Sequence, residues 1–236
     1  MSGHPRLVEV RQRVMKQNDL AARRLRERFH KAGTYVVSLV SSPGSGKTAF
    51  LEELLRRLRE THRVAALVGD LATDNDARRL ARSLVPVRQI TTGTVCHLEA
   101  SMVEAALEPW VLSEIDILFL ENVGNLVCPS TFDLGEDQRL VLFSVTEGED
   151  KPLKYPTIFH TADVALITKT DLAAAVDFDS VAAHRSIQSV RPGMEVFEVS
   201  AKTGKGIERW IASFLSRRSA MLRDREIRPA PEGSPP

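Results

Sequence analysis

From residue 35 onward, short runs rich in valine, isoleucine and leucine alternate with segments whose apolar residues recur at helical spacing. We predict strands at Tyr35–Ser41, Arg63–Asp70, Ile115–Glu121, Leu140–Val145, Val164–Thr168 and Met194–Val199. We predict helices at Thr48–Arg59, Asp74–Leu84, His97–Leu107, Phe178–Val190 and Ile207–Met221. This alternation predicts an α/β fold with a doubly wound, mostly parallel sheet, in which ligands bind at the carboxyl ends of the strands.

The residues before the first strand form a basic arm. Residues 1–34 contain nine lysines and arginines and three acidic residues (+6), whereas the rest of the chain contains 23 and 28 (−5). The apolar residues of the arm that recur at mostly helical intervals are Leu7, Val10, Val14, Leu25 and Phe29. They predict an amphipathic helix, broken near Asn18 and Asp19, that packs on its own domain; binding to a nucleic acid or a membrane surface is the alternative. We assign residues 35–222 to the main domain and expect the proline-rich tail 223–236 to be disordered.

Composition excludes several classes of protein. No segment approaches the roughly 20 uninterrupted apolar residues of a membrane span. The first 16 residues carry charges where a secretory signal would be apolar, so we expect a cytoplasmic protein. Two cysteines in 236 residues cannot form a disulfide framework, which leaves buried, catalytic or metal-binding roles for them.

A glycine-rich segment follows the first expected strand. Residues 41–48 read Ser-Ser-Pro-Gly-Ser-Gly-Lys-Thr, which fits the phosphate-binding pattern G-x-x-x-x-G-K-[ST] except that Ser41 replaces the first glycine. Backbone N–H groups of this loop and the start of the next helix can surround phosphates. We expect Lys47 to neutralise the β- and γ-phosphates and the Thr48 hydroxyl to bind Mg²⁺. The residues assigned to phosphate binding are Pro43, Gly44, Ser45, Gly46, Lys47, Thr48 and Ala49.

A nucleoside triphosphate site also needs a second carboxylate for the metal and a sensor of the γ-phosphate. The segment Glu121-Asn122-Val123-Gly124 has the D-x-x-G spacing of switch GTPases, with Glu in place of Asp. We expect Glu121 to bind Mg²⁺ directly or through water, and the Gly124 N–H to meet the γ-phosphate. Asp70, at the end of another strand, is a second candidate ligand for Mg²⁺. Asp74 and Asp76 stay open between helix capping and metal binding.

Two further segments indicate the base. Thr168-Lys169-Thr170-Asp171 is similar to the guanine-binding element N-K-x-D, with Thr in place of Asn. The Asp171 carboxylate can accept from guanine N1–H and N2–H₂, and the Lys169 stem can cover one face of the base. Ser200, Ala201 and Lys202 match the S-A-K loop, whose backbone N–H can bind guanine O6. Together they favour GTP over ATP, although the missing Asn removes a hydrogen bond that braces the loop and predicts weaker or less strict guanine recognition.

Both cysteines lie in expected loops that flank the segment Glu121–Gly124. Cys96 and His97 are adjacent, and Cys128 follows Gly124 by four residues. Two thiolates and an imidazole suit Zn²⁺, Ni²⁺ or copper, and three ligands leave a position for water, a second subunit or a client protein. The alternative is a pair of buried, inert cysteines. A Cys-His nucleophile is disfavoured because adjacent residues place the base poorly.

Four segments resemble the HypB family of hydrogenase nickel-incorporation GTPases. They are SSPGSGKT (Ser41–Thr48), TGTVCHLEA (Thr92–Ala100), ENVGNLVCPSTFDLGE (Glu121–Glu136) and SVTEGEDKPLKYP (Ser144–Pro156), within a similarity over roughly residues 35–215. The resemblance implies a P-loop GTPase of the SIMIBI class, with slow hydrolysis of GTP to GDP and phosphate and a GTP-dependent homodimer. It also implies nickel or zinc at Cys96, His97 and Cys128, a HypA-like nickel-delivering accessory protein, and the hydrogenase large-subunit precursor as client.

The chain departs from the family pattern in its arm. It has no C-x-x-C-G-C nickel motif and no histidine-rich stretch, since only His4 and His30 fall there. We therefore do not expect nickel storage.

The spacing of Gly124 and Cys128 suggests a mechanism. A γ-phosphate that pulls on Gly124 would displace the loop bearing Cys128, so that the nucleotide state would control the affinity for the metal. The alternatives are a urease-accessory-like nickel GTPase, a divergent paralogue that serves another metalloenzyme, a metal-binding scaffold in which the nucleotide only controls dimerisation, and an ATP-dependent metabolite kinase built on the same loop. The basic arm on an acidic body favours an intramolecular or dimer-stabilising role over a nucleic-acid partner.

Overall fold

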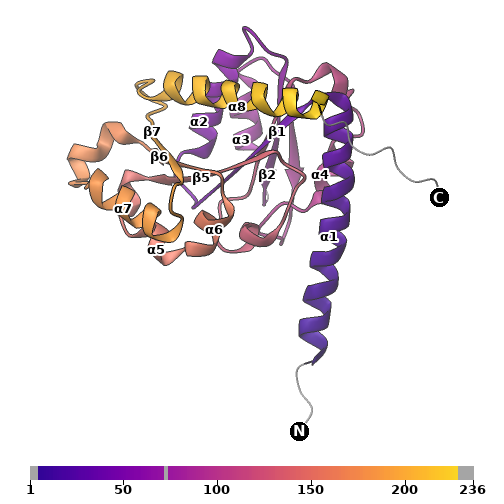
Figure 1. Ribbon diagram of the computed structural model, residues 1–236, viewed down its shortest axis with the longest axis horizontal. Coiled ribbons are helices and arrows are strands. Elements are labelled where there is room, and N and C mark those ends of the chain that lie inside the picture. The colour runs from indigo at the N-terminus through magenta and orange to yellow at the C-terminus, as the bar shows by residue number, and fades with distance from the viewer. Residues whose placement is uncertain (1–4, 72–73, 228–236) are drawn as a thin grey trace, which may run out of the picture.

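The structure, a computed structural model, describes residues 5–71 and 74–227. Within this part, seven strands form one sheet in the order β3-β2-β4-β1-β5-β6-β7, and every neighbouring pair is parallel. The strands are β1 (Tyr35–Ser41), β2 (Val64–Asp70), β3 (Val87–Thr91), β4 (Ile117–Glu121), β5 (Gln138–Ser144), β6 (Val164–Thr168) and β7 (Glu195–Glu198). The expected α/β fold with a doubly wound parallel sheet is confirmed (Figure 1).

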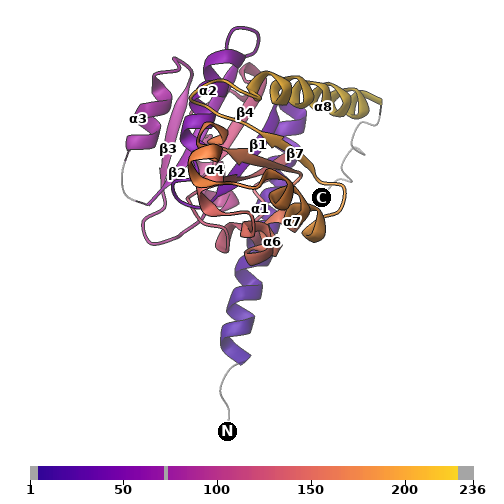
Figure 2. The same cartoon turned by 90° about the vertical axis from the view of Figure 1, so that its left-hand side faces the viewer.

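Helices cover both faces of the sheet (Figures 1 and 2). They are α1 (Pro5–Ala32), α2 (Lys47–Leu58), α3 (Asn75–Ala81), α4 (Ala100–Ala106), α5 (Lys151–Lys154), α6 (Pro156–Thr161), α7 (Ser180–Val190) and α8 (Ile207–Ile227). Successive residues of a strand point to opposite faces, so that Val37 and Leu39 of β1 join the core beneath α2 and α8. Val36 joins the core beneath α1 and α4, and Val40 the core beneath α6 and α7.

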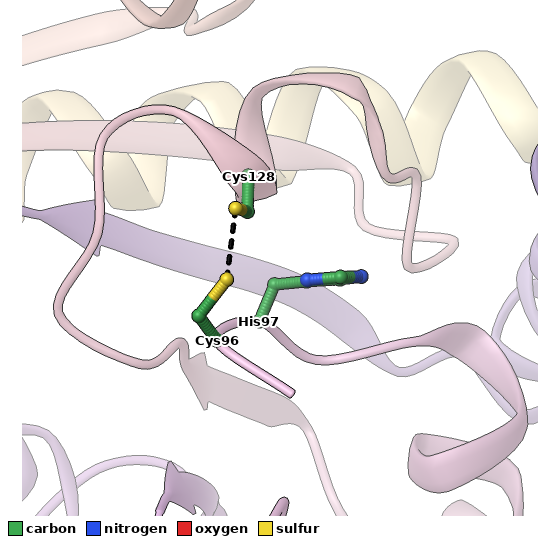
Figure 3. Close-up of side chains that lie close together, drawn as sticks. All are labelled: Cys96, His97 and Cys128. Carbon is green, nitrogen blue, oxygen red and sulfur yellow. Dashed lines mark hydrogen bonds between the residues drawn. The ribbon is translucent and has the colours of Figure 1, made fainter. Parts of the chain in front are cut away.

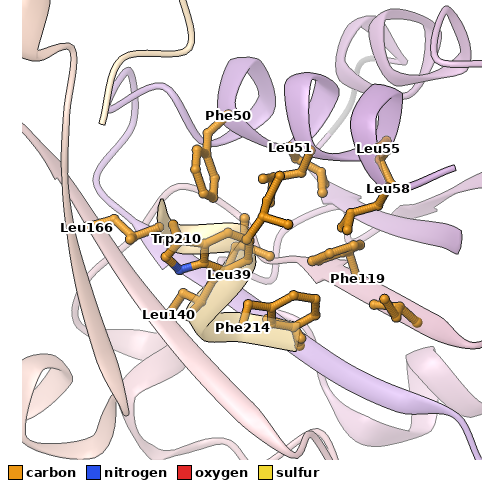
Figure 4. Close-up of a cluster of buried hydrophobic side chains, with 14 of the residues drawn as sticks. Leu39, Phe50, Leu51, Leu55, Leu58, Phe119, Leu140, Leu166, Trp210 and Phe214 are labelled. Carbon is orange, nitrogen blue, oxygen red and sulfur yellow. The ribbon is translucent and has the colours of Figure 1, made fainter. Parts of the chain in front are cut away.

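The core under α2 and α8 contains most of the buried aromatic side chains (Figure 4). Phe50 of α2 meets Trp210 of α8 edge-on at 5.4 Å between ring centroids, and Trp210 stacks on Phe214 at 4.9 Å. Such ring pairs add to the free energy gained by burying apolar area. They fix α2, which begins at the glycine-rich loop, against the sheet.

Helix α1 packs on the same domain, as expected, but it is continuous through Asn18 and Asp19, where a break was expected. Its second half buries Ala22, Leu25 and Phe29 against α4 and the sheet. Its basic side chains pair with acidic residues of the body, as in Arg26 with Asp133 at 2.7 Å. Figures 1 and 2 show the first half of α1 extending beyond the body.

Three features differ from the sequence prediction, and part of the predicted tail lies outside the described residues. Strand β3 was not expected, because its alternating sequence Val-Arg-Gln-Ile-Thr lies at the edge of the sheet and is mostly not buried. Helix α4 begins at Ala100, so that His97 lies in a loop. Residues 223–227, expected in a disordered tail, continue α8, and residues 228–236 and His4 lie outside the description. None of the helices within residues 5–71 and 74–227 combines the length and the apolar composition of a membrane-spanning segment.

Candidate nucleotide and metal sites

The glycine-rich loop joins β1 to α2, as the sequence predicts. Gly44 and Gly46 have φ values of +73° and +93°, a region that glycine occupies without the cost that a Cβ imposes. Lys47 is only 8% exposed, and its Nζ donates to Ser41 Oγ at 2.9 Å. Ser41, which replaces the first glycine of the motif, therefore contacts the lysine directly. Burial lowers the pKa of Lys47, and the nearby carboxylates Glu121 and Asp76 oppose that shift.

Glu121 ends β4 beside the loop, because β4 is the neighbour of β1. Its Oε1 accepts from Thr48 Oγ1 at 2.7 Å, while Oε2 is buried without a hydrogen-bond partner. Burial raises the pKa of Glu121 to about 7, against the lowering effects of Lys47 and Thr48. A buried carboxylate with a free oxygen next to a hydroxyl suits a cation, so Glu121 and Thr48 together could hold Mg²⁺.

The other acidic residues considered as Mg²⁺ ligands have different surroundings in the structure. Asp70 ends β2, and its Oδ1 accepts from the N–H of Leu71 at 2.7 Å; residues 72 and 73, which follow, lie outside the description. Asp74 precedes α3 without a side-chain capping bond and pairs with Arg78 at 2.7 Å. Asp76, in the first turn of α3, acts electrostatically on both Lys47 and Glu121. Asp76 therefore belongs to the surroundings of the phosphate loop, which the sequence had left open.

A cavity of about 310 Å³ lies beside the loop at the ends of β6 and β7. It is lined by Gly46, Ala49, Phe50, Thr168, Lys169, Asp171, Leu172, Val199, Ala201 and Lys202. Ser200 Oγ donates to Asp171 Oδ1 at 2.6 Å, so the two segments expected to recognise guanine are joined. Lys169 Nζ donates to the carbonyl oxygen of Gly44 at 2.6 Å, which ties this cavity to the phosphate loop. The cavity combines apolar walls with one carboxylate, as a purine pocket requires.

Thr168 braces this region in place of the missing Asn. Its hydroxyl donates to the carbonyl oxygen of Ser45 at 2.5 Å and lies 3.2 Å from that of Phe143. The expectation that the loop loses its brace at this position was wrong, because the shorter hydroxyl still reaches the phosphate loop.

The cysteines and the adjacent histidine come together from two loops (Figure 3). The Sγ atoms of Cys96 and Cys128 lie 2.8 Å apart, and one ligand atom from each of Cys96, His97 and Cys128 lies within 4.8 Å of the others. Both ring nitrogens of His97 are buried without a hydrogen-bond partner, and burial lowers the pKa of His97 and favours the neutral imidazole that binds metals. The ring packs on Phe132 at 3.9 Å between centroids. His97 Nε2 lies 3.7 Å from Glu99 Oε1. Imidazole nitrogens without hydrogen bonds beside two thiols fit a metal that binds thiolate and imidazole, such as Ni²⁺ or Zn²⁺.

The segment after β4 touches both sites. A Cβ built on Gly124 would lie 3.0 Å from the Cα of Pro43, so this glycine packs directly on the phosphate loop. One residue further, Asn125 Nδ2 donates to the carbonyl oxygen of Cys96 at 3.5 Å, and its Oδ1 accepts from the N–H of Cys128 at 3.4 Å. The metal site and the phosphate site therefore share one short segment.

Comparison with known proteins gives the family. Residues 35–198 match the model of the CobW/HypB/UreG nucleotide-binding domain. The chain belongs to this family. The hydrogenase maturation factor HypB of Azotobacter vinelandii is 46% identical over 220 residues, which cover 93% of this chain and 73% of that protein. HypB of Escherichia coli K12 is 43% identical, covering 91% and 74%.

Solved structures agree. The crystal structure of HypB from Helicobacter pylori in complex with nickel matches with a TM-score of 0.82 and 41% identity, covering 87% of this chain and 97% of that one. HypB from Archaeoglobus fulgidus matches with a TM-score of 0.80 and 37% identity, covering 86% and 99%. This chain is therefore a P-loop GTPase of the hydrogenase maturation factor type, as its motifs indicate.

Sequence reasoning left Asp76 open and missed the roles of the amides Asn122 and Asn125 in the segment 121–128. Asn122 Oδ1 accepts from the N–H groups of Leu98 and Val123, both at 2.9 Å. The signal was available, because both amides lie within the segment that carries the family resemblance, between Glu121 and Cys128.

Proposed function

We propose that this chain is a metallochaperone that binds Ni²⁺ at Cys96, His97 and Cys128 and uses GTP binding and hydrolysis to insert it into [NiFe]-hydrogenase. The observation that carries the proposal is the gathering of the three ligand atoms within 4.8 Å of one another, beside a switch segment that also packs on the phosphate loop. The nickel complex of the Helicobacter pylori relative supports nickel as the metal. Zn²⁺ suits the same donors and is the competing metal.

The nucleotide would lie with its phosphates in the loop from Pro43 to Ala49 and its base in the 310 Å³ cavity. Lys47 would neutralise the β- and γ-phosphates, and the N–H of Gly124 would meet the γ-phosphate. Asp171 would accept from guanine, the Lys169 stem would cover its face, and the backbone of the Ser200–Lys202 loop would bind O6. The hydrogen bond from the Ser200 hydroxyl to Asp171 would orient the carboxylate for that role.

Thr48 and Glu121 would hold Mg²⁺, with Asp70 as a further candidate. The support is the hydroxyl and carboxylate pair at 2.7 Å and the unpartnered Glu121 Oε2. A cation held by these residues would supply positive charge against the negative charge that develops on the phosphates during transfer to water. Catalysis by this chain would then rest on positioning by Lys47, Thr48, Glu121 and Gly124, with slow intrinsic turnover.

Nucleotide control of the metal would act through the segment 121–128. Because Gly124 touches Pro43 and Asn125 bonds to both cysteine loops, a shift of Gly124 toward a γ-phosphate would act on the backbone at both Cys96 and Cys128. Ligands would then separate or converge, which changes the affinity for Ni²⁺.

The partners we propose are a second copy of the chain in the GTP state, an accessory protein that supplies nickel, and the precursor of a hydrogenase large subunit, in the cytoplasm. A urease client is the second candidate, because relatives from Helicobacter pylori at 42% identity are named hydrogenase/urease maturation factors. A nucleotide-controlled scaffold would lack turnover that depends on Lys47. An ATP-dependent kinase would need an adenine site, whereas Asp171 and Ser200 favour guanine.

The test is a titration of the purified full chain with Ni²⁺ against a competing chelator. Wild type should bind one Ni²⁺ per chain, and Cys96→Ala and Cys128→Ala should abolish stoichiometric binding while the GDP affinity changes little. Thr131→Ala, an exposed residue in the turn that begins at Cys128, is the matched control and should bind Ni²⁺ as wild type does. Retention of one tightly bound Ni²⁺ by both cysteine variants would refute the site.

A further inference from the structure

Asn18 is a buried polar residue in the middle of helix α1. It is 7% exposed, whereas its neighbours Gln17 and Asp19 are exposed. Asparagine is a weaker helix former than alanine or leucine, because its side chain competes for backbone hydrogen bonds. Helix propensity therefore does not explain a buried asparagine at this position. Its function must lie in the contacts that its side chain makes.

Those contacts satisfy both ends of the amide. Asn18 Nδ2 donates to the carbonyl oxygen of Asp133 at 2.8 Å, and Oδ1 accepts from the N–H of Ala100 at 2.9 Å. Ala100 is the first residue of α4, three positions after His97, and Asp133 lies five positions after Cys128. One side chain of α1 therefore connects the two backbone segments that carry the metal ligands.

The contact with the Cys128 loop is reinforced along α1. Arg26 donates to both carboxylate oxygens of Asp133 at 2.7 and 2.9 Å. A Cβ built on Gly135 would lie 2.8 Å from the carbonyl oxygen of Ala22, so the loop backbone lies directly on the helix. This loop has α1 as its support.

The contact with the Cys96 segment is equally restrained. Leu98 packs so closely on β2 that a Cβ on Gly69 would lie 2.7 Å from Leu98 Cδ2. The N–H of Leu98 also bonds to Asn122. Between that point and α4, the segment is held by Asn18 through Ala100. On this side, Asn18 joins the two ligand-bearing segments by hydrogen bonds to both backbones, beside the packing of His97 on Phe132.

We infer that Asn18 is a positioning residue for the metal site, which sets the separation of the Cys96–His97 segment from the Cys128 loop. The inference rests on the proposed nickel site. Metal affinity depends on ligand positions to within a few tenths of an ångström. Groups that contact the ligand residues but not the metal, and so orient those residues, contribute about 10–100-fold to affinity. Loss of the amide would leave the N–H of Ala100 and the carbonyl of Asp133 without this partner and let the two segments shift relative to one another.

The experiment compares Asn18→Ala and Asn18→Leu with wild type in the full-length chain. Leucine branches at the same carbon as asparagine and favours the helix, so this variant fills the site and removes the two hydrogen bonds, whereas Asn18→Ala removes them without adding volume. Gln17→Ala, the exposed amide one position earlier, is the matched control. We would measure the Ni²⁺ dissociation constant by chelator competition, the thiolate-to-nickel charge-transfer band in the near ultraviolet, and the affinity for GDP.

We expect both Asn18 variants to bind Ni²⁺ about tenfold more weakly with an altered charge-transfer band, while GDP binds as in wild type and Gln17→Ala is unchanged. Wild-type nickel affinity and spectrum in Asn18→Leu would overturn the inference and leave the proposed function standing. Equal losses of nickel and GDP affinity would also overturn it, because they would indicate general destabilisation. If wild type itself binds no Ni²⁺, the proposed function fails and the inference with it.

Discussion

Thr168 departs from the guanine-binding motif but still makes a hydrogen bond to the phosphate loop. Its hydroxyl reaches the carbonyl oxygen of Ser45 across 123 positions of sequence, and thereby joins the phosphate loop to the strand end beside the 310 Å³ cavity. The sequence alone could not predict this contact, because the distance between β6 and the loop is set by packing of the sheet.

We predict that Thr168→Val weakens the binding of GDP by about tenfold. Valine keeps the shape and removes the donor, which leaves the Ser45 carbonyl unpaired at a cost of roughly 1–2 kcal/mol. Isothermal titration with GDP measures the effect. Thr170→Val is the control, since the Thr170 hydroxyl is buried without a hydrogen-bond partner and its loss should leave the affinity near wild type. Equal effects of the two substitutions would contradict the bracing role.

The negative charge of Glu121 can be tested separately from its size. Glutamine keeps the size and the contact with Thr48 but removes the negative charge that would attract a cation. We predict that Glu121→Gln raises the Mg²⁺ concentration for half-maximal GTP hydrolysis at least about tenfold, while GDP binding without Mg²⁺ changes little. Phosphate release measured over a series of Mg²⁺ concentrations gives the answer, and an unchanged Mg²⁺ dependence would remove Glu121 from the metal site.

At the scale of elements, the sequence predicted the strands whose runs of apolar residues reflect burial in the sheet. Strands β1, β2, β4 and β6 are buried along nearly their whole length, and the apolar runs locate each within two residues. Strand β3 was missed because an edge strand buries little and so needs few apolar residues. Helix α1 was wrongly divided, since Asn18 looks like a break until its partners on two other segments are known.

The starts of β2 and β4 are joined by an ion pair that predicts a pH dependence. Asp116, just before β4, accepts from the backbone N–H of Arg63 at 2.8 Å and from its guanidinium at 2.7 and 3.2 Å. These hydrogen bonds hold the pKa of Asp116 below its usual value of about 3.9. A lowered folded-state pKa means that this stabilisation is fully present above about pH 4 and is lost as the pH falls through the folded value.

Asp116→Asn should therefore lower the thermal midpoint by a few degrees at pH 6 to 7, and the difference from wild type should shrink below about pH 4. Melting curves recorded between pH 3 and pH 7 would check it. Asp224→Asn, an exposed aspartate in α8, is the control and should follow wild type throughout. A difference that is independent of pH would mean that the charge of Asp116 is not what stabilises the fold.

At the scale of the whole molecule, the two sites are predictable as separate motifs, but their connection is not. The Cys-His pair and the later cysteine lie 32 residues apart, and their meeting depends on the order of β2, β4 and β1 in the sheet. The sequence suggested coupling from the four-residue spacing of Gly124 and Cys128. The contacts that support coupling come from Pro43 and Asn125, and they involve backbone atoms that sequence patterns do not specify.

The coupling yields the last prediction. Wild type should bind Ni²⁺ with different affinities in GDP and in a non-hydrolysable GTP analogue, and by linkage the metal should change nucleotide affinity by the same factor. Gly124→Ala should reduce that ratio toward one. Its Cβ would lie 3.0 Å from the Cα of Pro43, a backbone atom that no side-chain rotation can move. The segment 121–128 would therefore stay displaced from the phosphate loop whichever nucleotide is bound.

The control separates coupling from damage to the metal site. Val127→Ala changes a side chain that is 63% exposed in the same segment, and it should preserve the wild-type ratio. Gly124→Ala should still bind one Ni²⁺, because Asn125 and the three ligands are intact. If its two affinities differ as much as those of wild type, the γ-phosphate does not act through Gly124. If wild type shows no difference at all, hydrolysis must release nickel by another route, and dimerisation measured in the two nucleotide states becomes the remaining link between GTP and the metal.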